Sequence, residues 1–178
     1  MDKQTEEILQ KIEEAEYVLV GLGQEFDMEF FLQSREDYRR IREQLQQQNV
    51  LWLLPYVEEQ FRRQYLPEME AEIEKGLQKL AEVLEKKSYF VVSSSLNHKL
   101  AEVPWKKMLL KKERFVAPCG DWTKKQCPDG CEEGIQTVTE ADEEQLQESF
   151  KKLQTNGFSV PDLGKCPKCG KKLVLNNV

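Results

Sequence analysis

The sequence has a single histidine, His98, and no long apolar run. Its longest apolar stretches cover residues 17–22 and 50–54, far short of the roughly 18 residues that cross a bilayer. The first residues, MDKQTEEIL, are acidic and polar and do not resemble a secretion signal. A metal site built from several histidines is excluded because there is only one. We therefore expect a cytoplasmic protein without a membrane-spanning helix.

Basic side chains are fewer than acidic ones. The chain carries 26 lysines and arginines against 32 acidic residues, a net charge of −6. This balance disfavours binding of nucleic acid or anionic membranes, which relies on neutralising phosphate groups. The 178 residues suit one ordinary domain, and 3 tryptophans, 5 tyrosines and 8 phenylalanines are enough for a packed core.

Apolar spacing predicts an alternation of helices and strands. A helix is expected over residues 3–15, followed by a short buried strand over 17–23 that ends in glycines. Residues 28–87 have helical periodicity, and further apolar strands are expected at 88–95 and 114–116. Strands that are this far apart in the chain need crossover connections, which favours a parallel α/β sheet over a hairpin protein.

The composition changes after Cys119, where turn-forming residues become frequent. We predict a Rossmann-like α/β part over residues 1–118, with an incomplete parallel sheet and a helical insertion at 28–87. A zinc-binding module is predicted over 119–178, with one amphipathic helix at 142–154.

Four of the five cysteines form two short pairs. Three residues separate Cys127 from Cys131, two separate Cys166 from Cys169, and 34 residues lie between the pairs. In a reducing cytosol this arrangement favours a metal over disulfides, and four thiolates suit tetrahedral Zn²⁺. A redox-active pair is the alternative, disfavoured because no strand-helix-strand pattern surrounds Cys166. Four cysteines leave no open coordination position, so the zinc would be structural and its loss should unfold 119–178.

Small and polar residues follow the first two predicted strands. Gly21 and Gly23 lie where a dinucleotide site needs small residues, so that backbone amides can approach a pyrophosphate. The third glycine of the GxGxxG pattern is missing, and a tight turn after a buried strand explains the pair equally well. Ser93, Ser95 and Asn97 lie at the end of the second strand, where open α/β sheets place ligand groups, although such residues are also common in loops.

Taken in order, the segments VLVGLG, YFVVSSSLN, RFVAPCGDW and the two cysteine motifs CPDGC and CPKCGKKLVLNNV resemble the sirtuin family of NAD-dependent protein deacylases. The resemblance implies a Rossmann-like sheet with a zinc ribbon, NAD as cofactor, and transferase chemistry on acylated lysine. The cofactor-binding positions that it implies are Gly21, Gly23, Gln24, Ser93, Ser95 and Asn97.

The sequence departs from the family where the family's chemistry takes place. Cys119, followed by the expected Gly120, occupies the position of the catalytic histidine, which deprotonates the nicotinamide ribose. A thiol acts as a general base only as the thiolate. In the match to the family's TQNxD motif, Ser95 replaces the asparagine and Asn97 the aspartate. The chain also ends at Val178, before the family's later cofactor and substrate strands.

These departures leave two hypotheses. The first is a degenerate sirtuin-like protein with structural zinc and NAD or ADP-ribose binding, in which the substitution at Cys119 argues against deacylase activity. The alternative is a non-enzymatic zinc-ribbon module, or a subunit that needs a partner chain. That alternative predicts an exposed apolar surface and stable association with another chain or with a second copy.

Overall fold

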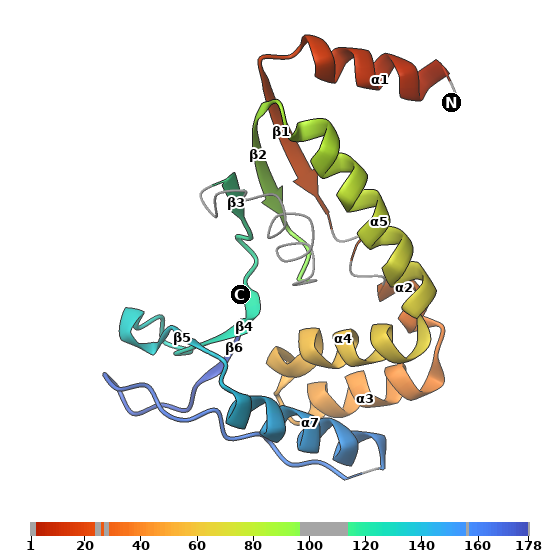
Figure 1. The fold of residues 1–178 in the computed structure, drawn as a ribbon. Coiled ribbons are helices and arrows are strands. Elements are labelled where there is room, and N and C mark those ends of the chain that lie inside the picture. The colour runs from red at the N-terminus through yellow and green to blue at the C-terminus, as the bar shows by residue number, and fades with distance from the viewer. Residues whose placement is uncertain (1–2, 24–25, 27–28, 97–113, 156, 178) are drawn as a thin grey trace.

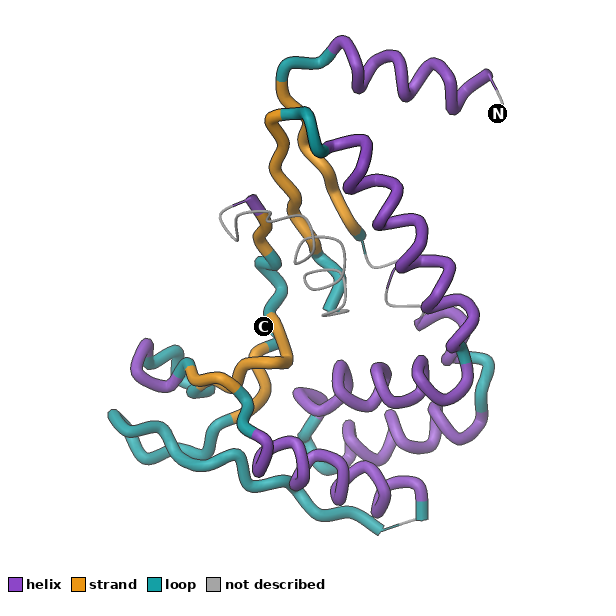
Figure 2. Tube along the Cα trace, viewed as in Figure 1, coloured by secondary structure: helices purple, strands orange, loops and turns teal. Residues whose placement is uncertain are grey.

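The computed structural model describes residues 3–23, 26, 29–96, 114–155 and 157–177. It is a mixed α/β structure. Figure 1 shows a parallel sheet flanked by one long helix at one end, and a helical group with a second small sheet at the other. Figure 2 shows that long loops occupy much of the carboxyl-terminal third of the chain.

The first sheet contains the three predicted strands. β1 (Tyr17–Leu22), β2 (Ser88–Ser93) and β3 (Phe115–Val116) run parallel in the order β1-β2-β3, with Leu22 opposite Ser93. The prediction of a parallel sheet is therefore confirmed. All six residues of β1 pair in register with β2, so the carboxyl ends of these two strands lie at one edge.

One long helix covers one face of this sheet. α5 (Pro67–Leu84) begins with a proline in its first turn, where the missing amide hydrogen has no intrahelical acceptor to lose. Its buried residues Leu77, Ala81 and Leu84 form an apolar core with the sheet. The strand residues of that core are Leu22, Tyr89 and Val91, with Val18, Val20 and Phe115 partly buried against it.

None of the described side chains of the other amino-terminal helices belongs to this core. α1 (Lys3–Glu14) projects from the start of β1 and buries no residue. α2 (Glu29–Gln33), α3 (Glu36–Gln47) and α4 (Leu54–Tyr65) pack together, with the short 3₁₀ helix η2 (Leu51–Leu53) leading into α4. Among the described helices, none has the length and apolar character needed to cross a membrane.

The cysteine-containing region forms the second sheet. β4 (Asp121–Gln126) lies between β5 (Gln136–Thr137) and β6 (Val174–Asn176), antiparallel to both. α7 (Glu140–Gln154) follows β5 and starts two residues before the predicted 142. The earlier start results from a capping box, in which the Thr139 side chain accepts from the backbone N–H of Asp142 and the Asp142 carboxylate accepts from that of Thr139.

This region shares a hydrophobic core with α2, α3 and α4. Phe61 of α4 packs edge-on against Phe150 of α7, with ring centroids 5.9 Å apart, and Tyr56 packs against Trp122 of β4 at 5.5 Å. The helical segment is thus divided at Pro67, because the helices before it pack on the cysteine region and α5 packs on the parallel sheet.

Candidate metal centre

The four predicted cysteine ligands come together at the tips of two tight turns. Cys127 directly follows β4, and Cys131 precedes the short 3₁₀ helix η4 (Glu132–Gly134). Cys166 and Cys169 lie in a second turn, closed by the pairing of Lys165 with Lys172. Each turn therefore brings its own two thiols close together.

A glycine with positive φ closes each turn. Gly130 has φ +70° and donates its backbone N–H to the carbonyl of Cys127 at 3.0 Å. Gly170 has φ +74° and donates to the carbonyl of Cys166 at 2.9 Å. This left-handed conformation is easily adopted only by glycine, which explains why both cysteine motifs contain one.

The sulfur positions fit a tetrahedral ion. All four Sγ atoms lie within 4.8 Å of one another, and the Sγ atoms of Cys127 and Cys169 are 3.4 Å apart. A tetrahedron with Zn–S bonds of about 2.3 Å has sulfur separations of roughly 3.8 Å, so small shifts of the side chains would complete it. The cluster could therefore hold a metal ion.

The site has a buried side and an exposed side. Cys127 and Cys166 are each 2% exposed and belong to the core shared with the helices, whereas Cys169 is exposed. Burial alone would raise the pKa of the Cys127 thiol. Hydrogen bonds from the backbone N–H of Asp129 and from the neighbouring thiols outweigh it and lower that pKa to about 7. The hydrogen bond to Cys127 raises the pKa of Cys131 to about 12, because the first thiolate disfavours a second one.

Ion pairs connect the two turns at the surface. Lys171 Nζ lies 2.7 Å from Asp129 Oδ1, and Lys168 Nζ lies 3.3 Å from Glu133 Oε2. In each pair the lysine comes from the second turn, whereas Asp129 lies in the first turn and Glu133 in η4 directly after it. These four residues are exposed, so each pair contributes only modestly, but both favour the arrangement that brings the cysteine pairs together.

Position 134 requires a glycine, which the sequence motifs did not reveal. It is buried, and a Cβ at this position would lie 2.4 Å from Cys127 Cβ and 2.9 Å from its backbone nitrogen. No side chain fits there unless Cys127 moves. The only sequence signal is a glycine three residues after the first cysteine pair.

A buried ion pair supports the base of the site. Lys125, at the end of β4, directs Nζ to both carboxylate oxygens of Asp142 at 3.0 and 2.8 Å and to the carbonyl of Leu163 at 2.8 Å. The lysine and aspartate side chains are 9% and 8% exposed. Burial alone would raise the pKa of Asp142, but the hydrogen bonds from Lys125 and Thr139 lower it. The pair joins β4, the start of α7 and the loop before Cys166.

The residues predicted to bind a cofactor lie partly together at the carboxyl edge of the parallel sheet. Gly21 is the penultimate residue of β1 and Gly23 directly follows the strand, while Ser93 ends β2. The backbone N–H of Ser94 donates to the carbonyl of Leu22 at 2.9 Å, which brings the two strand ends side by side. Ser95 is only 3% exposed. Its carbonyl lies 3.4 Å from the Ser93 hydroxyl.

The remaining predicted positions are not all described. Gln24 and Asn97 lie outside the described residues, as does His98. Cys119 is half-buried in the connection from β3 to β4 and is not one of the four clustered cysteines. It follows β3 by three residues, so it also lies beyond the carboxyl end of a parallel strand.

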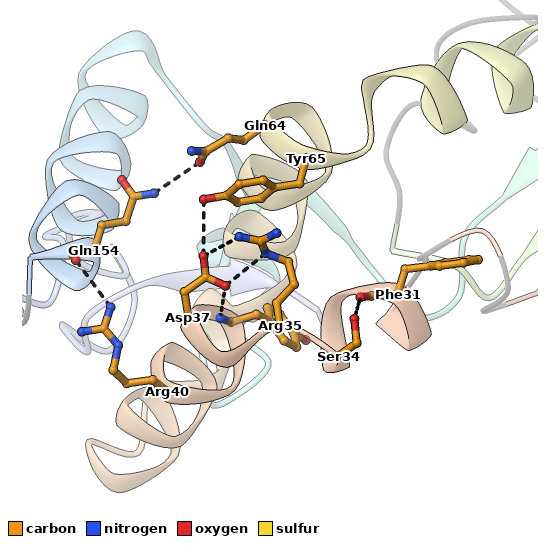
Figure 3. A network of polar contacts seen from close by, with 9 residues as sticks. Phe31, Ser34, Arg35, Asp37, Arg40, Gln64, Tyr65 and Gln154 are labelled. Atoms are coloured by element: carbon orange, nitrogen blue, oxygen red, sulfur yellow. Dashed lines mark hydrogen bonds and ion pairs between the residues drawn. The ribbon is translucent and has the colours of Figure 1, made fainter.

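A polar network among the helices was not predicted from the sequence. Figure 3 shows Arg35 beside Asp37 and Tyr65. The guanidinium donates to both Asp37 oxygens, at 3.0 and 2.8 Å, and lies 3.4 Å from the centroid of the Tyr65 ring. The Arg35 hydrogen bonds lower the pKa of Asp37. An open hollow of about 550 Å³ lies here, lined by Ser34, Arg35, Glu36, Asp37 and Arg40. Tyr65 also donates to Asp37 at 3.3 Å, so the network joins the start of α3 to the end of α4.

No model of a protein family matches the sequence, and neither does any curated protein. The resemblance to sirtuins therefore rests on the sequence motifs alone.

Proposed function

We propose that this chain is a structural zinc-binding protein, in which Cys127, Cys131, Cys166 and Cys169 hold one Zn²⁺ as thiolates. The observation that carries the proposal is the gathering of four Sγ atoms within 4.8 Å. Four sulfur ligands without a histidine or carboxylate are typical of zinc sites that are closed to water. The ion would thus hold the two turns together and would not activate a nucleophile.

Metal content and stability of matched cysteine variants test this proposal. Cys166→Ser removes a ligand, so it should abolish stoichiometric zinc in the purified protein and lower its melting temperature. Cys119→Ser is the matched control, because Cys119 is outside the cluster, and it should retain one zinc per chain. A parent protein that takes up no zinc, or a Cys119→Ser variant that loses it equally, would refute the assignment.

A second function is favoured by the carboxyl edge of the parallel sheet. We propose that this edge binds the ADP-ribose part of NAD, as the resemblance to sirtuins implies, without protein deacylase activity. In open α/β sheets, ligands bind beyond the carboxyl ends of the strands, and here Gly21, Gly23 and Ser93 lie at that edge. A Cβ at Gly21 would meet no atom within 4 Å, so packing does not require a glycine there. Close approach of a ligand to the backbone would require one.

Isothermal titration with NAD and with ADP-ribose tests the second proposal. Both ligands should release heat with the parent, and Gly21→Val should weaken binding at least about tenfold by placing a branched side chain at the strand end. Gly76→Ala is the control, since Gly76 lies in α5 and a Cβ there also meets no atom within 4 Å. Absence of heat at millimolar ligand would refute the binding. A deacylation assay tests the proposed absence of deacylase activity, with Cys119→His assayed beside the parent. Deacylation by the parent would refute that part of the proposal.

A further inference from the structure

The second face of the parallel sheet is apolar and exposed. α5 covers the first face, yet Tyr17 and Leu19 are 73% and 74% exposed, and Phe90 and Val116 are 39% and 41% exposed. We call these four residues the open face. Leu19 and Phe90 are register partners, so the apolar surface continues across β1 and β2. Parallel sheets are normally covered on both faces, which makes this an interaction surface.

β1 is also an open edge strand. Within the described part of the chain its backbone pairs only with β2. Its sequence, YVLVGL, has no charge and no proline, the two features with which proteins commonly block pairing at a sheet edge. Another strand can therefore add to β1 through main-chain hydrogen bonds.

The residues of β1 are complementary to themselves. Alternate side chains of a strand point to the same side, so Tyr17, Leu19 and Gly21 share the open face. In an antiparallel pair centred on Leu19, this residue meets the partner's Leu19, and Tyr17 meets the partner's Gly21. An aromatic ring across from a strand glycine compensates for its missing side chain, and an interface of two-fold symmetry requires such self-complementarity.

α1 carries an exposed apolar stripe. Ile8 is 51% exposed and Ile12 is half-buried, and the helix buries no residue. Lys87 Nζ donates to the carbonyls of Glu13 and Ala15, which anchors the end of α1 beside the start of β1. Figure 1 shows α1 projecting away from its own sheet.

We infer that β1, the open face and α1 bind a second copy of this chain. The two three-stranded sheets join edge to edge through antiparallel β1 strands, and α1 of each copy covers the open face of the other. With about 150–250 Å² for a fully exposed aromatic side chain, the exposed parts of the open face and Ile8 amount to about 500 Å² per copy. Two copies then bury on the order of 1,000 Å², the lower size of a specific interface.

Light scattering coupled to size exclusion tests the dimer on the zinc-loaded chain. The parent should have twice the mass of the 20.9 kDa chain. Leu19→Lys should reduce the mass to that of one chain, because it places a charge at the centre of the strand pair. Tyr17→Glu should do the same, and circular dichroism should show that both variants keep the fold. Ile135→Lys is the control, since Ile135 is 55% exposed in the cysteine region, and it should remain dimeric.

Two results would overturn the inference. The first is a parent of 20.9 kDa at every concentration tested. The second is a dimer that persists in folded Leu19→Lys and Tyr17→Glu, because another surface would then form it.

Discussion

Replacing Lys125 with methionine should destabilise the fold more than any substitution of an exposed lysine. Its Nζ donates to two oxygens of Asp142 and to the carbonyl of Leu163, at 2.8–3.0 Å. Methionine has a similar length but leaves the Asp142 carboxylate buried without its counter-charge. Removing one partner of a buried ion pair costs about 3–5 kcal/mol. The side chains of the pair are 9% and 8% exposed, so solvent screening reduces this value little.

Urea unfolding of the zinc-saturated protein, followed by circular dichroism, measures the effect. With an m-value of about 2 kcal/mol/M, the loss corresponds to a midpoint lower by about 1.5–2.5 M. Lys152→Met is the matched control, because Lys152 pairs with Glu148 at 2.6 Å on the surface of α7 with both side chains exposed. That variant should lose less than about 1 kcal/mol.

A double variant separates the ion pair from packing. Lys125→Met combined with Asp142→Leu removes both charges, and the remaining deficit should be about 1 kcal/mol from the lost helix cap. The reasoning would be refuted if Lys125→Met alone lost no more stability than Lys152→Met. It would also be refuted if the double variant were less stable than Lys125→Met, because a buried unpaired carboxylate would then not be the cause.

Two further predictions concern the same region. The pKa of Asp142 is lower in the folded than in the unfolded chain. Its contribution to stability is therefore present above about pH 4 and is lost as the pH falls further. Urea midpoints measured against pH should fall more steeply in acid for the parent than for Asp142→Asn, and parallel curves would contradict this. Gly134→Ala should weaken zinc affinity by about 10–100-fold in a chelator competition, since the new Cβ would lie 2.4 Å from Cys127 Cβ. The control Gly76→Ala should keep the parent's zinc affinity. Equal zinc affinity in the two variants would contradict the steric argument.

The parallel strands and the cysteine cluster were predictable because their signals are local. A continuous apolar run that ends in glycine or serine predicts a buried strand, and both runs form strands. The predicted burial is wrong for β1, because only one face of this strand packs against α5 and the other leaves Tyr17 and Leu19 73% and 74% exposed. The cysteine spacing likewise determines which thiols can share an ion. The start of α7 was misplaced by two residues because the capping role of Thr139 depends on geometry and not on apolar periodicity.

The strand β4 and its buried lysine were not predictable in this way. The segment DWTKKQ reads as a polar turn, and lysine is seldom buried unless it is paired. It forms a strand because β5 and β6 pair with it on either side and Asp142 neutralises Lys125. Asp142 lies 17 residues away in the sequence, and the β6 partners lie farther still. Context of this kind overrides local strand propensity.

The shared core changes what a bound metal would stabilise. The cysteine spacing alone indicated that zinc would maintain residues 119–178. In the structure, Cys127 and Cys166 belong to the same core as Tyr38, Phe61 and Phe150. A metal that fixes the two cysteine turns therefore also holds the surface against which α3 and α4 pack.

The core that contains the cysteine cluster ends at the junction of α4 and α5. Arg62 lies 3.0 Å from both Glu59 and Glu70, and all three side chains are at most 7% exposed. These buried charges tolerate little rearrangement, since each depends on its partners for solvation. The Arg62–Glu70 pair joins α4, which belongs to the core with the cysteine cluster, to α5, which supports the parallel sheet. The ion network therefore joins the core that contains the cysteine cluster to the helix that supports the parallel sheet.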